Sequence, residues 1–114
     1  MTNNEFEVVV KNCIGSIQKV LGNKAKEYAS KEDRLHNFNK AKDLMRCKTR
    51  EYALLGMLNK HLVSVIDIVM NYENFNAVPA KEVLEEKIGD TINYMILLKA
   101  CFLEDAYSKA KKEE

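Results

Sequence analysis

The sequence predicts an all-α protein, a helical bundle of about four helices in which two helices are long and largely apolar. A single proline and four glycines leave long stretches without residues that interrupt helices. Apolar residues recur at the spacing of one helical face over most of the chain. Because 114 residues is the length of one typical domain, we expect a single domain over residues 1–114 with a frayed tail at about 107–114.

The first half of the chain predicts two helices separated by a loop. The first helix covers about 4–29, because its large apolar residues recur at helical spacing. The charged residues of 30–37 lack this periodicity and predict a loop. A short helix over about 38–47 should follow, with Leu44 and Met45 on its buried side.

The second half predicts the two long helices. Thr49 is a suitable N-cap, since its hydroxyl can accept a hydrogen bond from an unpaired backbone N–H, for a helix that continues to about Asn71. Residues 74–79 then form a turn. Pro79 suits the first position of the last helix, which continues through Ala106.

The third predicted helix is apolar around most of its circumference, which indicates burial by its own domain or by another subunit. A chain of this length cannot easily bury all of that surface by itself, so we expect a homodimer or a higher homo-oligomer. The polar residues of this helix form one narrow stripe, and His61 lies beside that stripe. The stripe consists of Lys60, Ser64, Asp67 and Asn71.

The fourth predicted helix carries a polar patch in its apolar seam. Asp90 lies one heptad from an apolar residue on each side, while Glu86 and Asn93 share its face. Two carboxylates one turn apart repel each other unless a cation, a basic side chain or a proton offsets the repulsion. The patch predicts either polar contacts between helices, with Lys60 or Lys87 as the neutralising group, or a Mg²⁺ site at Glu86 and Asp90.

Composition excludes several classes of protein. The net charge of +1 argues against general nucleic-acid binding. The run 62–70 is interrupted and too short to span a bilayer, and the N-terminus lacks the pattern of a signal peptide, so we expect no membrane association. Three widely spaced cysteines form neither a disulfide framework nor a zinc pattern, and they predict buried free thiols in a cytoplasmic protein.

Three segments of the sequence resemble known proteins. EEKIGDTINYMILLKA, at 85–100, resembles the second metal helix of the MazG-like nucleoside triphosphate pyrophosphohydrolases, which are all-α enzymes. KAKEYASKEDRLHNFNKA, GMLNKHLVSVID and EEKIGDTINYMILL, at 24–41, 56–67 and 85–98, resemble blocks of small phage-encoded proteins. The resemblance to the phage proteins is the more specific of the two and covers much of the chain.

The resemblance implies a MazG-like core that handles a nucleotide in the cytoplasm, the host cytoplasm if the chain is phage-encoded. The enzymes hydrolyse a nucleoside triphosphate to the monophosphate and pyrophosphate with the help of divalent cations. Glu86 and Asp90 would then hold Mg²⁺, with His61 and Asp67 completing the catalytic site from the third helix. The expected substrate-binding residues are Lys60, Asn93, His36 and Asn37.

The sequence departs from the enzyme pattern, which leaves three functions open. The enzymes carry an E-x-x-E pair on the preceding helix, where this chain has His61, Ser64 and Asp67. The protein could therefore be a weak or degenerate pyrophosphohydrolase, a non-catalytic module that sequesters a nucleotide, or a helical factor that acts on a host protein. His61 and the loop with His36 also have a purely structural interpretation, in which Asn37 caps the next helix.

Overall fold

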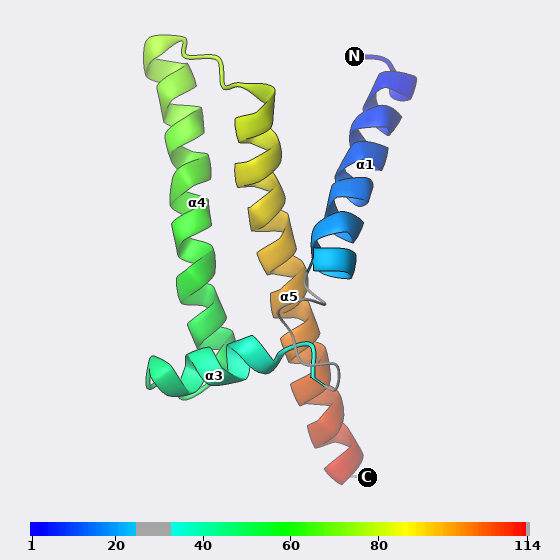
Figure 1. The fold of residues 1–114 in the computed structure, drawn as a ribbon, viewed down its shortest axis with the longest axis vertical. Coiled ribbons are helices and arrows are strands. Elements are labelled where there is room, and N and C mark those ends of the chain that lie inside the picture. Colours follow the sequence, from blue (N-terminus) through cyan, green and yellow to red (C-terminus); the bar gives the residue numbers. More distant parts are fainter. Residues whose placement is uncertain (25–32, 114) are drawn as a thin grey trace.

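The computed structural model describes residues 1–24 and 33–113, which form helices and no strand (Figure 1). The elements in chain order are α1 (Asn3–Ile17), the π-helix η1 (Gln18–Lys24), α3 (His36–Leu44), α4 (Arg50–Phe75) and α5 (Lys81–Glu113). The chain is 85% helical, which confirms the predicted all-α class.

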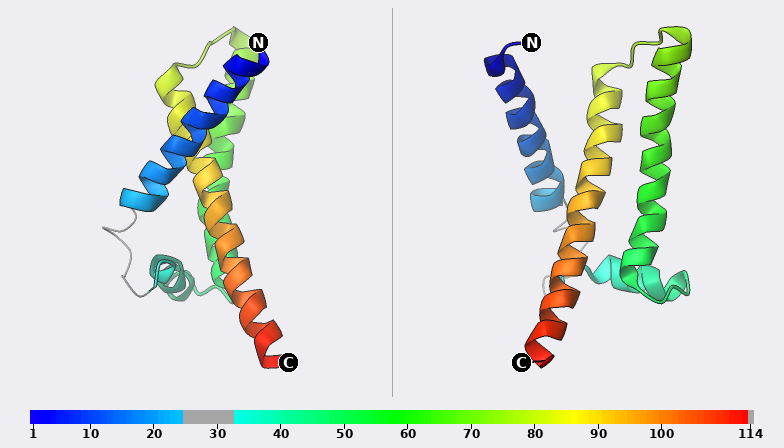
Figure 2. Two further views of the ribbon diagram at one scale, coloured as in Figure 1. Left: turned by 90° about the vertical axis from the view of Figure 1, so that its right-hand side faces the viewer. Right: turned by 180° about the vertical axis from the view of Figure 1, so that it is seen from behind.

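An antiparallel hairpin of α4 and α5 is the centre of the fold, and the two helices lie side by side in every view (Figures 1 and 2). The connection between them follows Asn76, whose backbone is left-handed with φ 52° and ends α4. The prediction that this helix ends near Asn71 was one turn too short. Pro79 lies two residues before the first residue of α5 rather than at its first position, because the chain is still turning there.

The N-terminus of α4 is capped as predicted. The hydroxyl of Thr49 accepts a hydrogen bond from the backbone N–H of Tyr52 at 3.2 Å. Thr2 caps α1 in the same manner through the N–H of Glu5, at 3.1 Å. These contacts satisfy backbone donors that have no partner inside the helix.

The short helix α3 begins two residues earlier than expected, at His36. Its entry is held by Asp33, whose carboxylate accepts a hydrogen bond from the backbone N–H of Leu35. Leu44 and Met45 are 85% and 50% exposed, so the prediction that they form the buried side of this helix is wrong for the single chain. The inner side is formed instead by Leu35 and Phe38, which pack on α5 and α4.

The first helix differs from the prediction of one continuous helix. It ends at Ile17 and passes into the π-helical turn η1, and the expected continuation over 25–29 lies outside the described residues. Figure 2 shows α1 leaning away from the hairpin toward its N-terminus. Its apolar residues are therefore largely exposed in the single chain, and so is Cys13, which was expected to be buried.

The hydrophobic core of one chain is small. Among the described residues the buried hydrophobic side chains are those of Leu35, Ala53, Leu54, Leu58 and Cys101, and five partly buried residues pack against the cluster of Leu35, Leu54 and Cys101. The radius of gyration is 17.0 Å, whereas a compact domain of this length has about 13 Å. The single chain is thus an extended arrangement of helices whose apolar surfaces are mostly unburied.

By length and composition alone, the 26-residue helix α4 could cross a membrane. Many core helices of soluble proteins meet the same criteria. Only 17% of its most apolar window is buried inside the chain. The sequence interpretation considered the shorter run 62–70, so the full extent of this helix was not anticipated.

Candidate functional site between α4 and α5

The hairpin brings two of the expected residues, His61 and Asp90, together with Tyr94, which the sequence analysis did not single out. His61 of α4 and Tyr94 of α5 have stacked rings, with centroids 4.7 Å apart and planes inclined by 28°. Nδ1 of His61 lies 3.9 Å from Oδ2 of Asp90, one turn before Tyr94. The ring of His61 is thus held between an aromatic face and a carboxylate, rather than in a wholly apolar interior.

Asn93 is the buried polar residue of this region. Only 6% of it is exposed, and among the described residues its Oδ1 has no hydrogen-bond donor. Leaving a buried amide oxygen unpaired costs about 1–3 kcal/mol. Such a group is unusual in a folded chain and marks a position where a ligand or a further polar group would be favourable.

The remaining candidates of α4 and α5 point mainly toward solvent. Glu86 is exposed, and its carboxylate lies 3.4 Å from Nζ of Lys87. Lys60 and Asp67 are exposed on α4. The hydroxyl of Ser64 donates a hydrogen bond to the backbone carbonyl of Lys60 at 3.3 Å. The hydrogen bond of Ser64 is therefore made within α4 rather than with α5.

The carboxylates available to a cation are few. In residues 1–24 and 33–113, no three acidic, histidine or cysteine side chains form a group that could hold a metal ion. Glu86 and Asp90 remain one turn apart on α5, and Mg²⁺ is commonly held by one or two carboxylates together with substrate phosphates. For both residues to share such an ion, Glu86 would have to leave Lys87.

His36 and Asn37 form the first turn of α3, where His36 is half-buried and Asn37 is exposed. Asn37 lies inside the helix and does not cap it. A hydrogen bond from Arg50 to Asn39 holds α3 at the start of α4, about three helical turns before His61. The structure thus places these two expected substrate-binding residues near the start of α4, about three helical turns from the level of His61 and Asp90.

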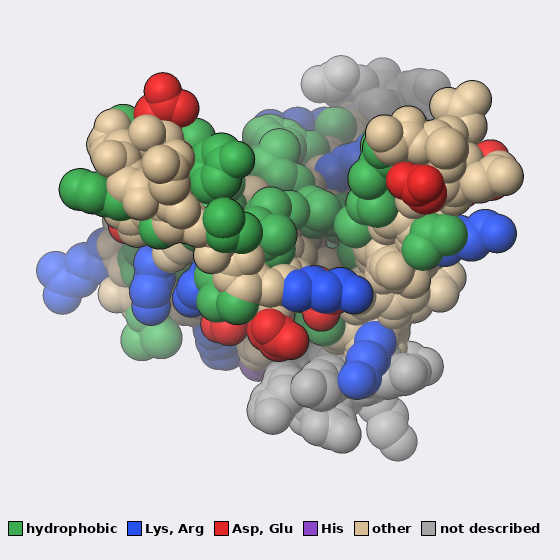
Figure 3. All heavy atoms as spheres, turned by 90° about the horizontal axis from the view of Figure 1, so that it is seen from above, with side chains coloured by type: hydrophobic (Ala, Val, Ile, Leu, Met, Phe, Trp, Pro, Cys, Tyr) green, Lys and Arg blue, Asp and Glu red, His purple; other side chains and the backbone are tan. Residues whose placement is uncertain are grey.

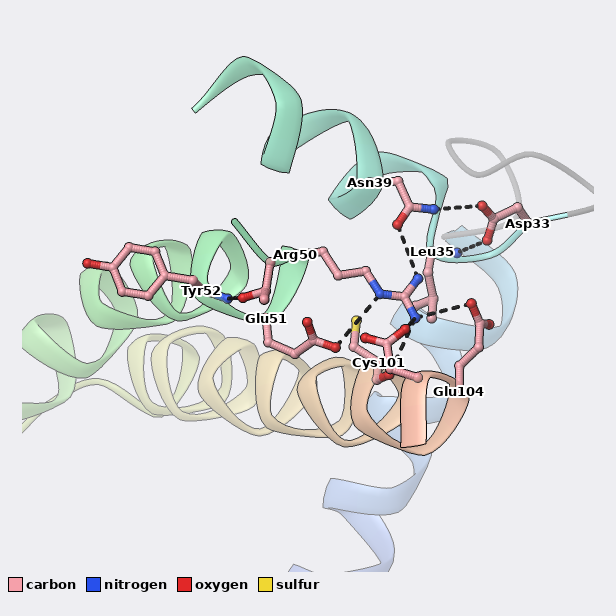
Figure 4. A network of polar contacts seen from close by, with 10 residues as sticks. Asp33, Leu35, Asn39, Arg50, Glu51, Tyr52, Cys101 and Glu104 are labelled. Carbon is pink, nitrogen blue, oxygen red and sulfur yellow. Dashed lines mark hydrogen bonds and ion pairs between the residues drawn. The ribbon is translucent and has the colours of Figure 1, made fainter. Parts of the chain in front are cut away.

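A second polar cluster, which the sequence interpretation missed, joins α3, α4 and α5 (Figure 4). Arg50 has a side chain only 7% exposed, and it donates hydrogen bonds to four acceptors. The acceptors are Oδ1 of Asn39 (3.2 Å), the carbonyl of Cys101 (3.3 Å), Glu104 (3.1 Å) and Asp105 (2.9 Å). Asn39 in turn donates to Asp33, so the network also reaches the entry of α3.

The acids around Arg50 have perturbed pKa values. Burial raises the pKa of Glu51, and its neighbour Asp105 raises it further. The contact with Glu51, and then the charge of Arg50, hold the pKa of Asp105 below its usual range. Oε1 of Glu51 has no hydrogen-bond donor and lies 3.9 Å from Nε of Arg50, so the raised pKa of Glu51 reflects burial that this ion pair offsets only in part.

Buried Arg50 keeps its charge despite the cost of burial, because the surrounding carboxylates raise its pKa. A signal for this cluster does exist in the sequence. An arginine in the first turn of a helix opposes the helix dipole and needs compensating acids. In a hairpin that turns at 76–80, residues equally far from the turn lie opposite each other, which pairs Arg50 with Asp105 and His61 with Tyr94.

The fold and the two clusters define a helical-hairpin protein with a polar patch midway along the hairpin and a structural ion cluster near its open end. Comparisons with models of protein families, with curated proteins and with solved structures find no match for this chain. The resemblance to MazG-like enzymes and to phage-encoded proteins therefore stays a prediction.

Proposed function

We propose that the protein binds a nucleotide at the polar patch of the hairpin, formed by His61, Asp90, Asn93 and Tyr94. The observations that carry the proposal are the buried Asn93 amide, whose oxygen lacks a hydrogen-bond donor, and the stacked rings of His61 and Tyr94, the residue that follows Asn93. An amide can read the hydrogen-bonding edge of a base, and an aromatic surface can stack on it. A carboxylate such as Asp90 accepts hydrogen bonds from ribose hydroxyls.

Basic residues near the patch suit the phosphates of such a ligand. Lys60 lies one residue before His61 on α4, and Lys87 lies one turn before Asp90 on α5. Lys87 is now beside Glu86, and phosphate oxygens would compete with that carboxylate for the ammonium group. Neither interaction requires a metal ion, so binding without turnover is the form of the function that these residues favour.

Hydrolysis with Mg²⁺ is the second candidate, favoured by the placement of Glu86 and Asp90 one turn apart on α5. In that case both carboxylates would hold the ion, while His61 and Asp67 would assist from α4. The ion would polarise the phosphate chain of a nucleoside triphosphate. Because no three potential metal ligands form a group among the described residues, this is the weaker of the two candidates.

The test is a thermal-shift panel of nucleotides and cyclic nucleotides, each with Mg²⁺ and with a chelator, followed by calorimetry on any ligand that shifts the midpoint. A ligand at 100 times its dissociation constant adds about 2.7 kcal/mol to the free energy of unfolding, which moves the midpoint by several degrees. We expect one nucleotide to stabilise the protein in the presence of chelator. Release of pyrophosphate, measured on the same samples, would identify the hydrolase instead.

Matched variants locate the site. Asn93→Ala and Asp90→Asn should weaken binding at least tenfold, whereas Asp43→Asn removes an exposed carboxylate on α3 and should leave binding unchanged. A flat panel would overturn the proposal and favour a helical factor that acts on another protein. If Asp90→Asn and the unmodified chain bound the nucleotide equally well, the assignment of the site to this position would be wrong.

A further inference from the structure

The helix α4 has two apolar faces, one turned toward α5 and the other about 110° around the helix axis, and the chain covers only the first of them. The inner face packs toward α5 and is buried or half-buried; it consists of Leu54, Leu58, His61, Val65 and Ile68. The outer face consists of Tyr52, Leu55, Asn59, Leu62, Ile66 and Val69. Every residue of this second group, which we term the outer seam, is exposed.

The outer seam follows the spacing of a coiled coil. Its residues alternate at intervals of three and four, which assigns Asn59 and Ile66 to position a and Leu55, Leu62 and Val69 to position d of a heptad. Tyr52 also falls at a, and the β-branched Ile66 at a with Leu55 and Leu62 at d is the combination that favours two parallel strands. A single asparagine at a fixes the register of the pair and the number of strands.

The exposed surface of the chain is larger than that of a compact monomer, which leaves area for a partner. The chain exposes 9154 Å², about 2,800 Å² more than a compact monomer of 13.1 kDa. A standard interface buries about 800 Å² on each partner. The excess exposed area of the chain is therefore larger than the area that one stable interface buries on each partner. Ile66, at the middle of the seam, is 57% exposed.

A lipid bilayer is the other environment that would accept an apolar face. Figure 3 shows hydrophobic side chains exposed on the hairpin and across toward α1, but with charged side chains among them. Lys60 and Asp67 lie near the middle of α4, and Asp90 lies beside them on α5. A charge at the centre of a transmembrane helix costs about 2.5–3.5 kcal/mol, so the hairpin is poorly suited to lipid.

We infer that the outer seam is the surface on which a second copy of this chain docks, with the two α4 helices parallel and Asn59 facing Asn59 of the partner subunit. A parallel pair places each seam residue opposite its own equivalent across a two-fold axis. The asparagine pair satisfies its amides across the axis and disfavours slipped registers. The inference does not depend on the nucleotide site, because no residue of the seam belongs to the patch of His61, Asp90, Asn93 and Tyr94.

The first test is the mass in solution at micromolar concentration, measured by light scattering on the full chain. We expect at least twice 13.1 kDa. Ile66→Asp should shift the mass to that of the monomer, and Val78→Asp, an equal change in the exposed hairpin connection, should not. A monomeric mass for the unmodified chain, or an unchanged oligomer for Ile66→Asp, overturns the inference. A monomeric chain that floats with neutral phospholipid vesicles would assign the seam to lipid.

Cross-linking tests the direction of the helices and keeps the inference falsifiable if Ile66→Asp does not fold. Leu62→Cys and Val69→Cys, each made with Cys13→Ser and Cys47→Ser, lie one heptad apart, about 10 Å along the helix. In a parallel pair both variants form a disulfide between identical positions. In an antiparallel pair identical positions meet at only one point along the helices, so no more than one of the two variants can form such a disulfide. Failure of either variant to cross-link under mild oxidation overturns the parallel arrangement.

Discussion

Replacing Arg50 by Met should destabilise the fold more than any other single change of charge among the described residues. The substitution preserves much of the aliphatic stem and removes the guanidinium that joins α3, α4 and α5. Breaking a buried ion pair by removing one partner costs about 3–5 kcal/mol. Glu104 and Asp105 are 58% and 42% exposed, however, and water can replace part of what they lose.

The net loss at Arg50 should therefore be about 2–4 kcal/mol, mainly from the unpaired carbonyl of Cys101 and the amide of Asn39. For a chain of 114 residues, 1 kcal/mol corresponds to about 4 °C in the unfolding midpoint, which gives a shift of about 8–16 °C. Thermal unfolding followed by circular dichroism measures it, at a fixed protein concentration.

Arg46→Met is the matched control, because Arg46 is exposed in the turn after α3. It should move the midpoint by no more than about 2 °C. Equal shifts of the unfolding midpoint for the two variants would show that the hydrogen bonds of Arg50 add no stability beyond its charge. That result would refute the predicted loss of stability at Arg50.

Three further predictions concern neighbouring features. Glu51→Gln should flatten the pH dependence of stability, because the raised pKa of Glu51 makes its contribution largest at acid pH and lost as the pH rises through that pKa; in urea unfolding, the unmodified chain should lose stability relative to this variant as the pH rises above the ordinary value of 4.5. Thr49→Ala should cost about 1 kcal/mol by removing the cap of α4, whereas Thr49→Ser should cost little, measured in the same assay. Asn76→Gly should be tolerated and Asn76→Ala should lower the midpoint, since φ is 52° at this position.

Helix type and the capping of α4 could be predicted from the sequence because they depend on local signals. The Thr49 hydroxyl acts on a backbone N–H three residues away, and no distant part of the chain is required. The end of α4 was missed because Asn71 and the polar residues after it resemble a turn. The left-handed residue that ends the helix is Asn76, one turn later.

The candidate site was predicted in part. A heptad count places Asp90 in an apolar seam, and the hairpin does bring it to His61. The spacing of residues along one helix does not indicate how much of that helix its neighbour covers. Glu86 lies at the edge of the same face as Asp90, and it is exposed to solvent beside Lys87. The burial expected at Leu44 failed because α3 contacts the core through Leu35 and Phe38 at its beginning, whereas Leu44 is its last residue and is exposed.

The Arg50 network could not be found by considering one helix at a time. Its carboxylates lie more than fifty residues away along the chain and become neighbours only when the hairpin closes. The stacking of His61 on Tyr94 has the same origin. Both contacts follow from the position of the turn, so an error of one residue in the turn would misplace each of them.

The short connection between α4 and α5 has a consequence for how the molecule folds. Only residues 76–80 separate the two long helices, so the entropy lost on closing this loop is small. Local contacts of this kind form on the microsecond to millisecond timescale. Pairing of two outer seams, in contrast, requires an encounter between molecules. Refolding should consequently show a fast phase whose rate is independent of protein concentration, followed by a slower phase whose rate rises with concentration.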